Sequence, residues 1–148
     1  AYKAIEWKVV FLIAGLIPLG MAMEKTGTAA FLAEKVMDVV QGGHPLLILF
    51  AIAVLSTLFS LFMSNVASTV VLAPLVINMA MIGKLDPRPL VLLVAVCAAN
   101  SFILPTHQVN AMYITPGGYR NLDYLKAGGG MTILFILVAM AVFYYIYI

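Results

Sequence analysis

The sequence predicts an all-α membrane protein, and three observations support this prediction. Of its 148 residues, 64% are hydrophobic and only 9% are charged, whereas charged residues make up about 25% of an ordinary soluble domain. The mean hydropathy is +1.10, and two long stretches carry no charge. A soluble fold of this length cannot bury so much apolar surface. The composition therefore excludes a soluble enzyme, a disordered tail and a nucleic-acid-binding module, and it predicts a chain embedded in the lipid bilayer.

Residues 1–44 are predicted to hold a scaffold-type membrane span followed by an interfacial helix. Val9–Met23 is uncharged and, with its flanks, about long enough to cross a bilayer. In Gly27–Gly43, apolar residues recur at helical spacing opposite charged ones, which is typical of an amphipathic helix lying at the membrane surface. Its apolar face is expected to consist of Phe31, Leu32, Val36 and Val39.

Residues 45–83 carry no charge and must reverse direction within the chain. As a single helix, Pro45–Gly83 would be about 58 Å long, nearly twice the thickness of the hydrocarbon core. The polar cluster Ser64–Ser68 lies at its middle and is the natural turn. Two geometries fit: two full spans joined by an exposed loop, or a re-entrant hairpin whose tip stops inside the membrane. Non-helical backbone at that depth occurs only where protein or a watery cavity satisfies it.

Residues 84–127 are predicted to form a broken transmembrane helix and a surface segment. The helix is expected to stop at about Leu104, near Phe102-Ile103, and to resume near Asn110, because Pro105 removes a backbone donor and disfavours helix at the residue before it. Residues 128–148 are predicted to form the final transmembrane helix, which ends in a belt of tyrosines.

The two interruptions predict an ion-coupled binding site. A helix that ends inside the membrane offers carbonyl groups to a cation such as Na⁺, and one that begins there offers N–H groups to an anion. No Asp or Glu lies between Pro45 and Leu85 or between Pro89 and Leu122. This absence favours coupling to Na⁺ over H⁺, because a proton relay needs an ionisable group at depth. The other hydroxyl and amide groups of the hairpin helices are expected to bond their own backbone or a neighbouring helix. These are Ser56, Thr57, Ser60 and Asn78.

At these interruptions the sequence resembles the divalent anion/sodium symporter family, whose members carry dicarboxylates, citrate or sulfate and contain two inverted repeats. Ser64-Asn65-Val66 is similar to the Ser-Asn-Thr motif at the hairpin tip of the second repeat, and Ala98–Asn110 is similar to the second broken helix. Asn110–Met112 and Pro116–Arg120 resemble the branch with cytoplasmic inserts of the TrkA C-terminal type, which would precede residue 1. The threonine of the motif is valine here, so both sulfate and a dicarboxylate remain open as the substrate.

The resemblance implies that the chain is one inverted repeat, the C-terminal one, of an elevator-type transporter in the bacterial inner (plasma) membrane. It would take up a small anion with Na⁺ and would need the missing N-terminal repeat and a second copy as a homodimer. The alternatives are an arsenite-type or proton-coupled anion exporter of the same superfamily, and a non-transporting membrane subunit. No enzymatic activity, organic cofactor or nucleic-acid partner is expected. The expected substrate ligands are Ser64, Asn65, Val66, Thr106, His107 and Asn110. The expected Na⁺ ligands are Ser64, Asn65, Ser68, Leu104 and Thr106.

Overall fold

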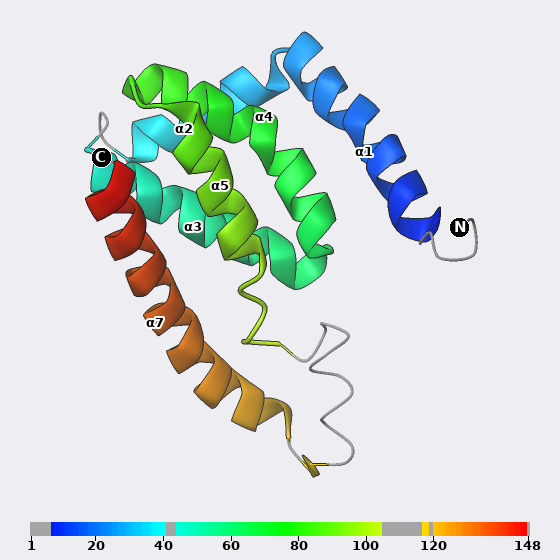
Figure 1. The fold of residues 1–148 in the computed structure, drawn as a ribbon, viewed down its shortest axis with the longest axis vertical. Helices are drawn as coiled ribbons and strands as arrows, with labels where there is room; N and C mark the ends of the chain where they lie inside the picture. The colour runs from blue at the N-terminus through cyan, green and yellow to red at the C-terminus, as the bar shows by residue number, and fades with distance from the viewer. Residues whose placement is uncertain (1–6, 41–43, 105–116, 119, 148) are drawn as a thin grey trace.

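The computed structural model describes residues 7–40, 44–104, 117–118 and 120–147, and the regular structure in these ranges is helical (Figure 1). By length and composition α3, α4 and α7 can each cross a membrane, and α5 is a shorter apolar helix. The predicted all-α class is therefore confirmed for the described residues. In chain order the long helices are α1 (Trp7–Lys25), α2 (Thr28–Val39), α3 (Pro45–Phe62), α4 (Asn65–Gly83), α5 (Pro87–Ala98) and α7 (Asn121–Tyr147).

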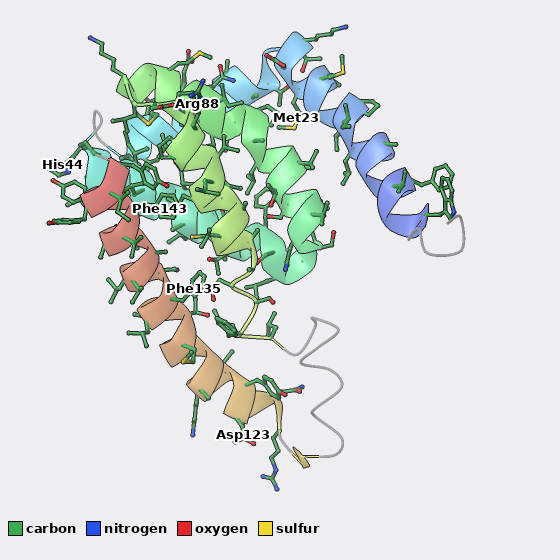
Figure 2. All side chains as sticks on the ribbon, in the orientation of Figure 1. Met23, His44, Arg88, Asp123, Phe135 and Phe143 are labelled. Atoms are coloured by element: carbon green, nitrogen blue, oxygen red, sulfur yellow. The ribbon has the colours of Figure 1, made fainter. Side chains whose placement is uncertain are left out.

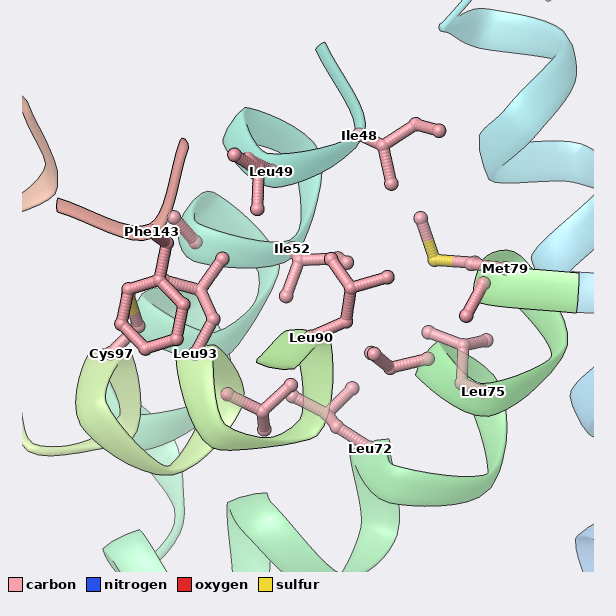
Figure 3. Close-up of a cluster of buried hydrophobic side chains, with 14 of the residues drawn as sticks. Ile48, Leu49, Ile52, Leu72, Leu75, Met79, Leu90, Leu93, Cys97 and Phe143 are labelled. Carbon is pink, nitrogen blue, oxygen red and sulfur yellow. The ribbon is translucent and has the colours of Figure 1, made fainter. Parts of the chain in front are cut away.

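The helices α3, α4 and α5 follow one another through short turns and enclose the core of the molecule (Figure 3). Each contributes fully buried aliphatic side chains, such as Ile52 of α3, Met79 of α4 and Leu93 of α5. Because lipid tails are as apolar as these side chains, close packing and hydrogen bonds between helices hold such a bundle together, rather than exclusion from water.

The helix α7 packs along α3 and α5 through one narrow stripe and continues well past the end of the α3–α4 hairpin (Figure 1). At about 1.5 Å per residue, its 27 residues make a helix roughly 40 Å long. The buried residues of the stripe recur every three or four positions, as one face of a helix requires. They are Gly128, Thr132, Ile136, Ala139 and Phe143.

Charged side chains lie toward the two ends of the bundle (Figure 2). Arg88 is at the α4–α5 turn, and Asp123 is at the opposite end, in the first turn of α7. Asp123 Oδ2 accepts a hydrogen bond of 2.8 Å from the backbone N–H of Arg120. This bond satisfies the chain where the helix starts, so α7 begins at Asn121, seven residues before the expected start of the final span at Gly128.

The helix α2 packs on the bundle through small residues rather than through the larger apolar side chains of the predicted interfacial helix. Ala29, Ala33 and Met37 are its buried residues, whereas Phe31 and Val39 are 58% and 82% exposed. Small alanines allow α2 to approach α4 closely, and its larger apolar side chains point outward. Apolar periodicity locates a helix, but in a membrane protein both the packed face and the lipid-facing side are apolar.

The helix α5 ends at Ala98, so the expected end near Phe102–Leu104 is wrong. The backbone N–H of Asn100 still bonds Cys97 O at 3.0 Å, and that of Ser101 bonds Ala99 O at 3.1 Å. The chain leaves the helix here because the Asn100 side chain finds partners on two other helices, as described below. The expected resumption near Asn110 lies outside the described residues.

Candidate substrate and cation site

The tip of the α3–α4 hairpin is a two-residue turn, Met63-Ser64, that carries no charge. Ser64 is extended and caps α4, because its Oγ accepts a hydrogen bond of 3.2 Å from the backbone N–H of Ala67. The sequence predicted that this helix starts near Ser68. The cap instead starts it at Asn65. The first N–H groups of α4 have no partner within the helix, and they give the tip a partial positive charge.

The interruption after α5 lies beside the last turn of α3. Ser60 Oγ donates to the backbone carbonyl of Asn100 at 3.4 Å, and Asn100 Nδ2 donates to Thr57 Oγ1 at 3.2 Å. On the other side, Thr132 Oγ1 of α7 donates to Asn100 Oδ1 at 3.1 Å. Asn100 is fully buried. One amide therefore connects the hairpin, the interruption and α7.

The backbone after Asn100 rests directly on α7 at a glycine. A Cβ added to Gly128 would lie 2.0 Å from the carbonyl oxygen of Phe102 and 2.6 Å from its carbonyl carbon. One and two turns further along α7, Thr132 bonds Asn100 and the ring of Phe135 meets that of Phe102 edge-on at 6.0 Å. Three positions on one face of α7 thus hold the interruption in place.

Two polar atoms near the hairpin tip are buried and have no hydrogen-bond partner among the described residues. These are Asn65 Oδ1 and Ser68 Oγ. Ser68 is fully buried, and it shares a helical face with Leu72 and Leu75 of the core. An unsatisfied buried polar group costs about 1–3 kcal/mol, so these atoms indicate a missing partner.

The four hydroxyl and amide side chains that were expected to be structural do bond as predicted. Ser56 Oγ donates to Ile52 O at 2.7 Å, and Asn78 Nδ2 donates to Pro74 O at 2.8 Å, both within their own helix. Ser60 Oγ donates to Thr57 O at 2.8 Å within α3 and also to the backbone carbonyl of Asn100. Ser60 therefore joins α3 to the segment after α5.

The described structure includes five of the predicted site residues. Ser64 and Val66 are exposed, Asn65 is half-buried and Ser68 is fully buried. Leu104 is half-buried and lies beyond the end of α5. The remaining predicted residues, Thr106, His107 and Asn110, lie outside the described residues. Among the described residues no three His, Cys, Asp or Glu side chains come together as metal ligands, so neutral oxygens are the groups that a cation at the tip would meet.

Two residues of this region did not emerge from the sequence as site candidates. Asn100 was included only as part of the second broken helix, and Thr132 was passed over as part of an apolar span. A signal existed, since an amide that ends an apolar run and a lone hydroxyl inside a membrane helix each need a partner. The sequence could not say that they partner each other.

Most of the chain matches a known protein family. Residues 1–97 match the citrate transporter family. The chain belongs to that family. Members of the citrate transporter family are transporters rather than enzymes, and together with the three apolar helices the match identifies the chain as part of a multi-pass integral membrane protein.

Relatives of the chain are found in bacteria, algae and animals. An uncharacterized transporter of Synechocystis is 41% identical over 90% of the chain, which corresponds to 22% of the relative. Solute carrier family 13 member 2 of Oryctolagus cuniculus is 31% identical over 93% of the chain and 23% of the relative. Sodium/sulfate cotransporter 1 of Chlamydomonas reinhardtii is 27% identical over 93% of the chain and 16% of its own length. The chain thus spans about a quarter or less of the length of each of these three relatives.

Proposed function

We propose that this chain is the second repeat of a sodium-coupled transporter for a small divalent anion, sulfate or a dicarboxylate. The proposal depends on one observation. Two interruptions of apolar helices lie side by side, and the buried oxygens of Asn65 and Ser68 beside them have no partner among the described residues. A relative that is named a sodium/sulfate cotransporter supports Na⁺ as the coupling ion. The TrkA-type branch remains a prediction from the residues between Asn110 and Arg120.

In this proposal the hairpin is re-entrant. Asn100 ties Ser60, in the last turn of α3, to Thr132 near the middle of α7. From Thr132 back to Asn121, α7 continues for about 16 Å, whereas the hairpin ends one turn beyond Ser60. If α7 crosses the membrane, the tip stops inside it. Uncharged residues at the tip agree with that depth, because charge there would be costly.

The proposed ligands divide by chemistry. Asn65 Oδ1, Ser68 Oγ and carbonyl groups at the ends of α3 and α5 would meet Na⁺, with Ser64, Leu104 and Thr106 as further candidates. The first N–H groups of α4 and the side chains of Ser64 and Asn65 would meet the anion. Thr106, His107, Asn110 and the surface near Val66 complete the proposed substrate side. The first repeat would supply the other half of the site.

The proposed transport movement is of the elevator type, with α3, α4, α5 and α7 as the moving unit. These helices share one buried core, to which Ala33 and Met37 of α2 also belong. The helix α1 instead borders α4 along an open groove of about 420 Å³, which is lined by Gly20 and Glu24 of α1 and by Thr69, Ala73 and Asn78 of α4. A groove along this boundary would leave room for one rigid body to slide on the other. We assign α1 and α2 to the static scaffold, which would also form the homodimer.

The test is uptake by the full-length protein reconstituted in liposomes, with labelled sulfate, succinate or citrate outside. An inward Na⁺ gradient is expected to drive uptake of at least one of them, and a K⁺ gradient is not. Transport driven by a pH gradient without Na⁺ would instead identify a proton-coupled carrier. Folded protein that moves none of the anions under any gradient would identify a non-transporting subunit.

A matched pair of serines tests the cation site. Ser68 and Ser56 are both fully buried in the hairpin, but only Ser56 is bonded, to its own helix. We expect Ser68→Ala to weaken Na⁺-dependent thermal stabilisation and uptake, and Ser56→Ala to leave the Na⁺ dependence unchanged. Equal Na⁺ dependence in both variants would remove Ser68 from the site.

The depth of the tip is tested by labelling. A cysteine at Ser64 is expected to react with a membrane-impermeant reagent from either side, depending on the state of the carrier. Reaction from one side only, under all substrate and ion conditions, would identify an ordinary external loop.

A further inference from the structure

We propose that Asn100 is a positioning residue, which holds the end of α5 against the hairpin and α7 and so sets the Na⁺ affinity of the tip. The inference rests on the proposed function. Asn100 lies two residues past the end of α5 and is fully buried. Its own contacts are with Thr57, Ser60 and Thr132 rather than with the tip.

An amide is the side chain that this position requires. Its Nδ2 donates to a hydroxyl on α3 and its Oδ1 accepts from a hydroxyl on α7, so one planar group spans two helices that face it from opposite sides. Thr57 and Thr132 are only 4% and 5% exposed, so water does not replace these bonds readily. An apolar residue at position 100 would break both bridges together.

The bridge fixes the interruption relative to the tip, because Asn100 is bonded through its backbone as well as its side chain. Its carbonyl accepts from Ser60 Oγ, one turn before the tip of the hairpin. The next residues rest on Gly128 with no room for an added Cβ. The carbonyls that end α5 are therefore located by contacts on α3 and α7. A binding site holds its ligand well only when its groups are kept within about 0.5 Å of the productive geometry.

Thr132 gives the sharpest test, because it lies on α7 and outside the proposed ligand set. Thr132→Val removes the hydroxyl and keeps the shape, whereas Thr132→Ser keeps the hydroxyl. Asn100→Ala removes both bridges. Ser56→Ala serves as the control, since it removes a buried hydroxyl one position away from Thr57 that bonds only its own helix.

The measurements use the full-length protein and Na⁺ itself as the probe. One is the Na⁺ concentration that gives half-maximal uptake in liposomes, and the other is the Na⁺-dependent rise in melting temperature in detergent. Loss of one hydrogen bond predicts that Thr132→Val raises the half-saturating Na⁺ concentration about three- to tenfold. The maximal rate should stay within about twofold, and Asn100→Ala should show a larger shift. Thr132→Ser and Ser56→Ala should behave as wild type.

The outcomes separate this inference from the proposed function. A normal Na⁺ response in wild type and an unchanged half-saturating concentration in Thr132→Val would overturn the positioning role and leave sodium coupling intact. No Na⁺ response in wild type would overturn both. A lower melting temperature in Thr132→Val with unchanged Na⁺ dependence would mean that the bridge is merely structural. If Asn100→Ala does not fold, the Thr132 variants still decide.

Discussion

The helix α4 begins and ends in turns of different construction. At its C-terminal end Lys84 takes a left-handed conformation, with a φ of 55°, and Asp86 caps α5 by accepting a hydrogen bond of 2.9 Å from the N–H of Arg88. All three residues are charged and exposed. At its N-terminal end the turn Met63-Ser64 is uncharged, and the nearby oxygens of Asn65 and Ser68 lack partners among the described residues.

The difference indicates what each end is for. The turn at Lys84–Asp86 closes its helix ends with its own residues, and its charges suit water or lipid headgroups. The turn at Ser64 closes only part of α4 and leaves polar atoms buried, which a stable protein tolerates where a ligand or another segment completes them. One helix thus joins a charged turn that caps itself to an uncharged turn beside buried polar atoms without partners among the described residues.

The largest expected effect on transport comes from removing the side-chain amide of Asn65, at the N-terminal end of α4. Asn65→Ala should abolish uptake, because a site built to hydrogen-bond a ligand loses a partner that nothing nearby replaces. Expression and membrane insertion should be retained. The measurement is Na⁺-driven uptake of sulfate and succinate per folded protein, and uptake at the wild-type level would contradict a role for Asn65 at the site.

The second prediction compares a glycine of α7 beside the interruption after α5 with the glycine that ends α4. Gly128→Ala should destabilise the protein by about 3 kcal/mol or more, since the new Cβ would collide with the backbone of Phe102, which has nowhere to move. At the C-terminal end of α4, a Cβ added to Gly83 would lie 2.8 Å from Ile48 Cδ1 and 3.8 Å from the Leu85 side chain. Gly83→Ala should therefore cost less, because the end of a side chain can shift and alanine favours helix by up to about 1 kcal/mol.

Thermal unfolding in detergent measures both changes. Gly129→Ala provides a neighbouring control, because a Cβ there meets nothing within 4 Å. If Gly128→Ala and Gly129→Ala melt at the same temperature, the interruption after α5 does not rest on α7 as described.

The cap that Asp86 provides to α5, next to the C-terminal end of α4, should affect stability alone. Asp86→Ala removes the acceptor for the Arg88 N–H, and loss of an N-cap typically costs about 0.5–2 kcal/mol. Melting temperature should fall while the half-saturating Na⁺ concentration stays constant, and Asp86→Asn should restore the melting temperature. A change in Na⁺ dependence would show that the surface turn is coupled to the site.

The smallest effect is expected at Val66, which is 39% exposed beside the tip. Val66→Thr keeps the shape and adds a hydroxyl, and one net hydrogen bond is worth about 0.5–1.5 kcal/mol. This predicts a shift of roughly severalfold in selectivity between sulfate and a dicarboxylate or in Na⁺ affinity. Identical uptake of both anions at several Na⁺ concentrations would mean that residue 66 points away from the site.

The chain reversal at Ser64 was predictable because length and charge leave no alternative. An uncharged stretch too long for one span must turn, and its polar residues mark the turn. The end of α5 was not predictable in the same way. It depends on Asn100 finding Thr57 and Thr132, which are 43 and 32 residues away along the chain, and Pro105 drew the expected end too far along.

The site was predictable by residue type more than by position. A cluster of small polar residues at a forced reversal identified the tip and included both Asn65 and Ser68, whose buried oxygens have no partner among the described residues. The sequence located the α2 helix but made no prediction of its packed face, because hydropathy does not distinguish the packed face of a membrane helix from its lipid-facing side. The expectations for Thr106, His107 and Asn110 remain predictions.

The Asn100 bridge also sets an order for biosynthesis. Thr57 and Ser60 leave the ribosome well before Asn100, and Thr132 follows later still. Until Asn100 has been synthesised, Thr57 lacks its partner on the segment after α5. Until α7 has been synthesised, Asn100 lacks its partner Thr132. Thr132 therefore completes the bridge last, and a chain that stalls before α7 leaves Asn100 Oδ1 without its partner on that helix.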